Sequence, residues 1–120
     1  MKIAIPSTGE TLDAQLDARL GRARCFLLYD TDSGQFEVLD NDQNVNAPQG
    51  AGVQAGQKIA DSGADAVLTN NCGPKAFRVL TSAGVDVYLG AQGTVAQAIE
   101  AFQAGELTLA DEANVEGHWM

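Results

Sequence analysis

The chain has 120 residues, of which seven are Lys or Arg and sixteen are Asp or Glu, so its formal net charge is −9. A chain of this length is expected to fold as one domain, residues 1–120, around a single hydrophobic core. Its acidity repels nucleic acid and anionic membranes, so neither is an expected partner. The sequence shows no apolar run of about 18 residues and no signal-peptide pattern, which predicts a cytoplasmic protein.

The first third of the sequence predicts one strand and a hairpin. Lys2–Pro6 has the pattern of a short buried strand and is followed by a long polar stretch, residues 7–24. Two β-prone runs, Cys25–Asp30 and Gln35–Asn41, flank four turn-forming residues, which is typical of an antiparallel hairpin. A loop as long as residues 7–24 is usually functional, so it is a candidate binding segment.

The rest of the sequence alternates between helical and extended patterns. Three helices are predicted, each ending at a glycine (Gly63, Gly84 or Gly105), and each glycine is followed by an extended run. The predicted helices are Ala51–Ser62, Pro74–Ala83 and Thr94–Ala104, and the extended runs are residues 64–70, 85–90 and 106–110. Such alternation is typical of parallel βα units, so we expect an α/β fold.

The helix starts carry recognisable signals. Pro74 suits a first helical position, and Thr94 with Gln97 forms a capping-box pattern. The first helix instead carries glycines in its early turns, Gly52 and Gly56 among them. Glycine costs a helix about 1 kcal/mol relative to alanine. We therefore expect either the sheet backbone or a ligand to approach this helix closely.

In an open α/β sheet, ligands bind beyond the carboxyl ends of the parallel strands. Residues 70–73 and 90–93 follow predicted strands and lead into helices, whose N-termini favour anions. Cys72 stands directly before a helix, a position that lowers a thiol pKa. The alternative is that Cys72 is an ordinary small buried side chain, which is the role we expect for Cys25.

Five of the seven cations occupy two short segments. Arg19, Arg22 and Arg24 fall within six residues, and Lys75 and Arg78 belong to the second predicted helix. Guanidinium groups brought to one crevice would bind an anion through charge-assisted hydrogen bonds. The alternative is a solvated loop whose arginines pair with carboxylates such as Asp13 and Asp17.

Other functions have weaker support in the sequence. It contains none of the common nucleotide-binding or hydrolase motifs, and its one histidine, His118, lies near the C-terminus beside Trp119. Asp30, Asp40 and Asp65 could form a two-metal hydrolase or nuclease site. A third alternative is an interaction module, free of any cluster, whose partner recognises the acidic surface.

The order of the motifs resembles the dinitrogenase iron-molybdenum cofactor biosynthesis family over nearly the whole chain. The most specific pieces are Gly-Arg-Ala at 21–23, Gly-Ala-Gly at 50–52 and Asn-Cys-Gly-Pro at 71–74. The resemblance implies a ribonuclease-H-like domain with a mixed, mainly parallel five-stranded sheet. It also implies a carrier of a metal-sulfide cluster, either molybdenum-copper or iron-molybdenum in type, that serves acceptor or assembly proteins and is not an enzyme.

The chain departs from the family at one position. A His-Phe pair commonly precedes Gly-Arg-Ala in the family, and Arg19-Leu20 stands there in this sequence. This removes a histidine ligand and favours charge-based holding of the cluster, with Cys72 as the expected metal ligand. The expected site is made up of Arg19, Gly21, Arg22, Arg24, Asn71, Cys72, Gly73, Lys75 and Gly93.

Overall fold

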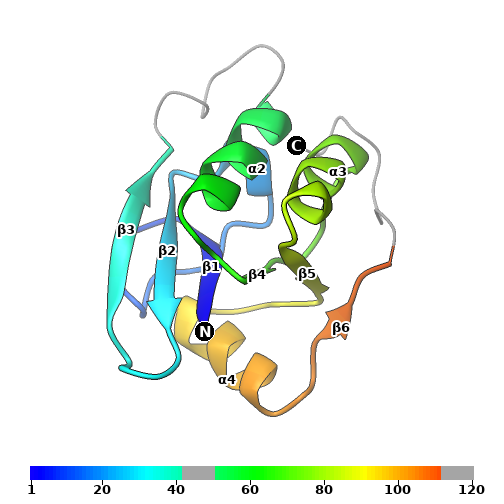
Figure 1. Ribbon diagram of the computed structural model, residues 1–120. Helices are drawn as coiled ribbons and strands as arrows, with labels where there is room; N and C mark the ends of the chain where they lie inside the picture. Colours follow the sequence, from blue (N-terminus) through cyan, green and yellow to red (C-terminus); the bar gives the residue numbers. More distant parts are fainter. Residues whose placement is uncertain (42–50, 112–120) are drawn as a thin grey trace.

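The computed structural model describes residues 1–41 and 51–111. Its strands are β1 (Lys2–Ser7), β2 (Cys25–Asp30), β3 (Phe36–Asp40), β4 (Ala66–Leu68), β5 (Asp86–Leu89) and β6 (Thr108–Leu109). Its helices are α2 (Ala51–Asp61), α3 (Pro74–Ser82) and α4 (Val95–Gln103), and a single 3₁₀ turn, η1 (Leu20–Arg22), precedes β2 (Figure 1). Within the described ranges, no helix is both long enough and apolar enough to cross a membrane.

The strands form one sheet in the order β3-β2-β1-β4-β5-β6. Only β1 with β4 and β4 with β5 pair in parallel, whereas the pairings of β3 with β2, β2 with β1 and β5 with β6 are antiparallel. The hairpin is confirmed, but the expectation of a mainly parallel, five-stranded sheet is wrong. An apolar alternation identifies a strand without encoding its pairing direction, and β6 runs antiparallel to β5. The ribonuclease-H-like assignment stays a prediction.

The three predicted helices are confirmed, with ends within one residue of the expected positions. Pro74 occupies the first turn of α3, and Thr94 and Gln97 make the reciprocal hydrogen bonds of a capping box at α4. The glycines that follow the helices have positive φ angles of 86° at Gly63, 81° at Gly84 and 75° at Gly105. Glycine adopts this left-handed conformation without steric cost, which is why each helix stops there.

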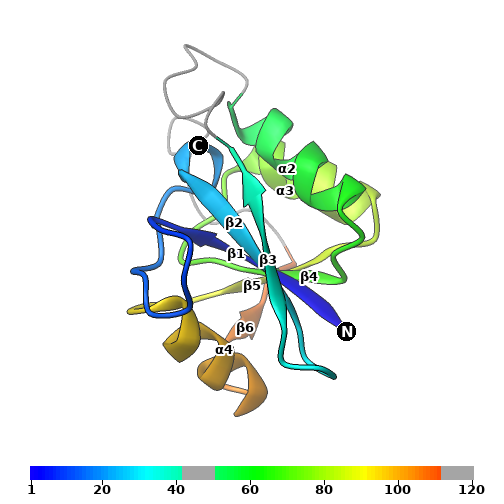
Figure 2. The same ribbon diagram turned by 90° about the vertical axis from the view of Figure 1, so that its left-hand side faces the viewer.

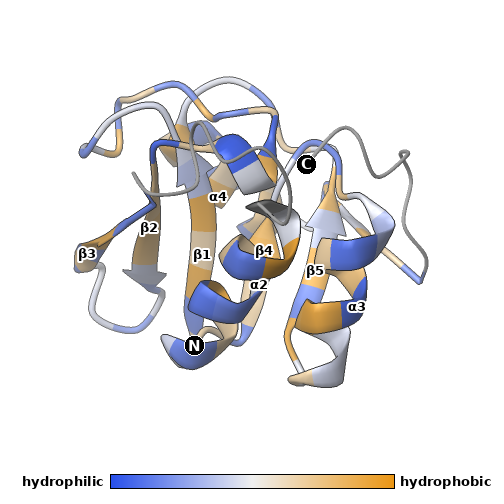
Figure 3. Ribbon diagram, turned by 90° about the horizontal axis from the view of Figure 1, so that it is seen from above, coloured by the Kyte–Doolittle hydropathy of each residue, from blue (hydrophilic) through white to orange (hydrophobic). Residues whose placement is uncertain are grey.

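Helices cover both faces of the sheet. α2 and α3 lie side by side on one face and α4 lies on the other (Figures 1 and 2). Under α2 and α3 the core includes Ala4, Phe26 and Val67, and under α4 it includes Ile5 and Leu27. Figure 3, with α2 and α3 in front of the sheet, shows the apolar colouring of the strands that they cover. Alternate residues of β1, β2 and β4 therefore contribute to two separate clusters.

Gly56 explains part of the glycine content of α2. A Cβ atom at this position would lie 3.3 Å from Cβ of Val79 and 3.4 Å from the carbonyl oxygen of Ala76, both in α3. The close neighbour at Gly56 is therefore the adjacent helix, and neither the sheet backbone nor a ligand is needed to explain this glycine.

We predict that Gly56→Val lowers the free energy of unfolding by about 2 kcal/mol, because the new side chain would force α2 and α3 apart. Gln54→Val, at an exposed position of the same helix, is the matched control because it introduces the same side chain without a facing helix. Urea denaturation of the two variants measures the difference. Equal losses would show that the helix contact at Gly56 is not limiting.

Candidate functional site

The site is built where several chain segments meet at one edge of the sheet. β1, β4 and β5 run in the same direction, so their carboxyl ends lie at this edge, which we call the carboxyl edge. β2 runs antiparallel to β1 and therefore begins at this edge. β3 runs antiparallel to β2 and therefore ends there. The edge therefore gathers η1, the end of β3 and the first turn of α3 from distant parts of the chain.

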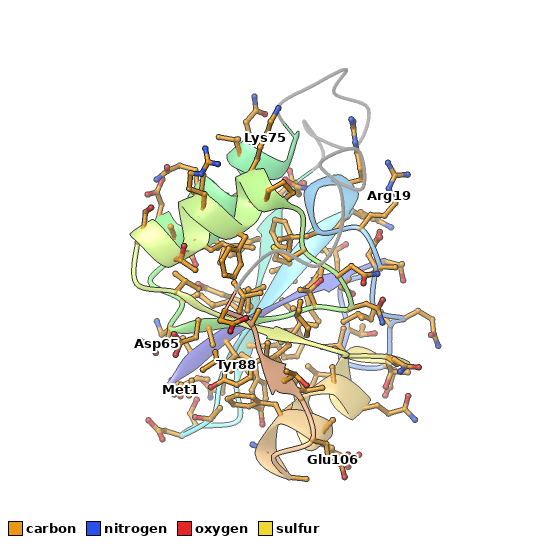
Figure 4. The ribbon with its side chains drawn as sticks, turned by 90° about the vertical axis from the view of Figure 1, so that its right-hand side faces the viewer. Met1, Arg19, Asp65, Lys75, Tyr88 and Glu106 are labelled. Atoms are coloured by element: carbon orange, nitrogen blue, oxygen red, sulfur yellow. The ribbon has the colours of Figure 1, made fainter. Side chains whose placement is uncertain are left out.

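Arg19 and Asn71 connect two of these segments directly. They form an isolated parallel β-bridge, which joins the residues before η1 to the loop between β4 and α3. Figure 4 shows the side chains of Arg19 and Lys75 pointing outward at the same end of the molecule, with Glu106 at the opposite end. The predicted arginine cluster and the Asn-Cys-Gly-Pro element are therefore adjacent.

Side-chain hydrogen bonds fix the loop after β4. The buried Thr69 donates its hydroxyl hydrogen to the carbonyl oxygen of Asn71 (3.1 Å), and Asn70 Nδ2 donates to the carbonyl oxygen of Ala91 (3.0 Å). Asn71 Nδ2 in turn donates to Asn70 Oδ1 (2.6 Å). The asparagine pair thus ties the ends of β4 and β5 together and sets the loop that presents Cys72 and Gly73.

Asn41 is a residue of this edge that the sequence analysis missed. It is fully buried at the end of β3, and its Nδ2 donates to the carbonyl oxygens of Ala23 (2.7 Å) and Gly21 (3.4 Å). Its backbone N–H donates to the carbonyl oxygen of Arg24 (3.2 Å). An asparagine at the end of a predicted strand was the available signal, but sequence alone did not show which loop it would hold.

The two helix N-termini at the carboxyl edge differ in what they offer an anion. Gly73 occupies the N-cap position of α3 in an extended conformation and makes no side-chain capping hydrogen bond. At α4, Thr94 caps the helix, and the N–H groups of Val95 and Ala96 donate to loop carbonyl oxygens at 2.9 Å. The first turn of α3 has few N–H groups to offer, because Pro74 has none and the N–H of Phe77 donates to the carbonyl oxygen of Gly73 (3.0 Å).

Gly93 supports the N-terminal cap of α4. Its carbonyl oxygen accepts a hydrogen bond from the N–H of Leu16 (2.8 Å), its φ is 82°, and a Cβ atom there would collide with Oε1 of Gln97. Gln97 uses this oxygen to accept from the N–H of Thr94 (2.9 Å). These contacts explain the glycine without a ligand.

Cys72 is buried, with 1% of its surface exposed, and lies in the core beneath α2 and α3. Burial raises its pKa from the ordinary 9.0 to about 12. The expectation that the position before α3 lowers this pKa is therefore wrong, because desolvation outweighs the helix terminus. Cys25 is 3% exposed and belongs to the core beneath α4, as expected.

The cations around η1 differ in their surroundings. Arg19 and Arg24 are exposed, and Arg22 is half-buried. Arg24 forms an exposed ion pair with Glu10, at 3.7 Å, and the backbone N–H of Arg19 donates to Asp17 Oδ1 (3.0 Å). The predicted partner Asp17 thus orders the backbone here. An exposed pair of this kind is weak, so Arg24 could exchange Glu10 for an anionic ligand.

The three carboxylates of the nuclease alternative are not all brought together. Asp65 accepts a hydrogen bond from the backbone N–H of Lys2 (2.8 Å) and so lies at the same end of the sheet as Asp30, but Asp40 lies apart from both. Asp40 pairs with Cys25 at the carboxyl edge, whereas Asp30 pairs with Lys2 at the other end of β2. A strand of this length separates its ends by about 17 Å, too far for a two-metal site. Across residues 1–41 and 51–111, no three His, Cys, Asp or Glu side chains are grouped so that they could hold a metal ion.

The structure also contains a shallow hollow of about 180 Å³ beside the hairpin. Its lining includes Lys2, Leu28 and Asp30, so it lies at the opposite end of β2 from η1. Asp30 is half-buried there, and backbone N–H groups, that of Asp32 first, lower its pKa. The hollow is therefore separate from the candidate site.

The pKa of Cys72 predicts how stability depends on pH. Between about pH 9 and pH 12 the thiol ionises in the unfolded chain but not in the folded protein, so its contribution to stability is lost as the pH rises through this window. We predict that the wild-type protein loses more stability between about pH 8 and pH 10.5 than Cys72→Ala does. Urea denaturation across this range tests it, and parallel curves would contradict it.

Comparisons with known proteins agree with this geometry. The structure is similar to the apo form of the orange protein from Desulfovibrio gigas, with a TM-score of 0.91, 38% identity and coverage of 95% of this chain and 96% of that chain. It is also similar to a Thermotoga protein described as a candidate NifB protein, with a TM-score of 0.83, 37% identity and coverage of 97% and 98%.

A protein that is related by sequence also matches most of this chain. An uncharacterized protein of Methanocaldococcus jannaschii is 30% identical over 110 residues, which cover 89% of each chain. Residues 1–105 match the family model described as dinitrogenase iron-molybdenum cofactor. The chain therefore belongs to the dinitrogenase iron-molybdenum cofactor family.

Proposed function

We propose that this protein binds and carries an anionic, molybdenum-containing metal-sulfide cluster noncovalently at the carboxyl edge. The observation that carries the proposal is the bridge between Arg19 and Asn71, which sets the arginine-bearing turn, residues 19–24, beside the N-terminus of α3. Family membership and the similarity to the orange protein support the same role.

The residues at this edge match what such a cluster needs. A sulfide-capped cluster brings its own sulfur ligands, so the protein has to supply positive charge and hydrogen-bond donors around it. Arg19, Arg22, Arg24 and Lys75 supply the charge. Gly73 and Lys75 supply backbone N–H groups, and the first turn of α3 supplies the positive end of a helix dipole.

The remaining residues of the predicted site have supporting roles in this proposal. Gly21 is a buried residue of the arginine-bearing turn itself, and Asn71 holds that turn to the next loop. Cys72 is 1% exposed and lies in the core beneath α2 and α3. We therefore assign Cys72 to the floor of the site. Gly93 supports the α4 cap.

The proposal is for a carrier and not for a catalyst. Arginine, lysine and backbone N–H groups bind an anion without activating a nucleophile or a water molecule, and Asp40 of the nuclease alternative lies at the opposite end of β2 from Asp30. An acceptor or assembly protein would then receive the cluster. Elemental analysis of protein purified from its native host would distinguish a molybdenum-copper cargo from an iron-molybdenum cargo.

Reconstitution tests the site. We predict that the protein becomes coloured with tetrathiomolybdate and copper, and that the double variant Arg19→Gln/Lys75→Gln binds the assembled cluster about tenfold more weakly, because two exposed cations are lost. Added salt should weaken wild-type binding by screening the same charges. Absorbance titration after gel filtration gives the affinities.

Lys58→Gln is the matched control, because it removes a cation from the last turn of α2, away from the carboxyl edge. It should bind as the wild type does. Wild-type protein that leaves gel filtration colourless would overturn the proposed function. Equal weakening by the control and the double variant would show that net charge, and not the carboxyl edge, holds the cluster.

A further inference from the structure

Asn41 closes β3 at the carboxyl edge, and no part of its side chain reaches solvent. Its amide group is placed to organise the arginine-bearing turn. Nδ2 donates to the carbonyl oxygens of Ala23 and Gly21, and the backbone N–H donates to that of Arg24. One residue therefore binds three carbonyl groups within four consecutive positions, the same positions that hold Arg22 and Arg24.

We propose that Asn41 is a positioning residue for anion binding, whose buried amide pre-orders the turn so that its guanidinium groups are already directed at the ligand. This inference rests on the proposed function. Asn41 itself does not touch the ligand, because its side chain is buried beneath the turn.

The energetic reason is the cost of ordering a loop. Fixing the backbone of one residue costs about 1–2 kcal/mol in conformational entropy. If the turn is already ordered in the free protein, its conformational entropy is lost during folding. The loss then does not reduce the affinity for the anion. Exposed arginines on a loose turn would bind weakly even with the same charge, so the held backbone makes a small number of cations effective.

The test uses Asn41→Asp in the full chain. The carboxylate has the shape of the amide but no N–H, so it repels the carbonyl oxygens of Gly21 and Ala23. We expect the affinity for a preassembled copper-thiomolybdate cluster to fall about tenfold. We also expect the amide hydrogens of residues 21–24 to exchange faster with solvent in the variant without ligand. A role in stability alone would not change affinity among folded molecules.

Ser7→Ala is the matched control. Ser7 is also fully buried at the carboxyl edge, where its hydroxyl donates to the carbonyl oxygen of Gly9 (2.6 Å), but its position in β1 alternates onto the α4 face with Ile5. We expect it to lose stability while its affinity stays within about twofold of the wild type. Affinities are compared at a temperature where circular dichroism shows each variant folded.

Asn41→Ser provides a second variant if Asn41→Asp does not fold. The serine hydroxyl retains one hydrogen-bond donor, so the affinity of Asn41→Ser for the cluster should lie between that of the wild type and that of Asn41→Asp. If Asn41→Asp does not fold, the affinity of Asn41→Ser should still lie below that of the wild type. Wild-type affinity in a folded Asn41 variant would overturn the inference and leave the proposed function intact. Wild-type protein that does not bind the cluster would overturn both.

Discussion

Parallel pairing of β4 with both β1 and β5 is the constraint on which the candidate site depends. It places the ends of three strands at one edge of the sheet, and the loops that follow them must meet there. The antiparallel hairpin then returns the chain to the same edge at the end of β3. Without this arrangement, Arg19 and Asn71 would be separated in space as they are in sequence.

The carboxyl edge also shows how an acidic protein can offer an anion site. The net charge of −9 acts at long range, but salt screens exposed charges over about 8 Å at physiological ionic strength. Within that distance, the local arrangement of guanidinium groups and helix N–H groups decides what binds. Overall acidity and local attraction are therefore compatible, and the same acidity limits association with other polyanions.

The limits of prediction follow from what the sequence patterns encode. Helix ends were predictable because Pro74, the Thr94–Gln97 capping box and the following glycines act locally. The pairing direction of the strands and the burial of Cys72 were not predictable, since both depend on contacts between residues that are far apart in the sequence. The resemblance to the family singled out the segments of Arg19 and Asn71, which the fold brings together, but the three-carbonyl contact of Asn41 arises only when β3 and η1 come together.

Gly93 has a consequence for reading related sequences. Its φ angle and the position of Gln97 Oε1 both require glycine as long as the capping box of α4 is present. Replacing Gln97 with a shorter residue would remove the collision but not the backbone requirement. A glycine retained at this position among relatives would therefore record the geometry of a helix cap, and its retention alone would be no guide to which of them carry a cofactor.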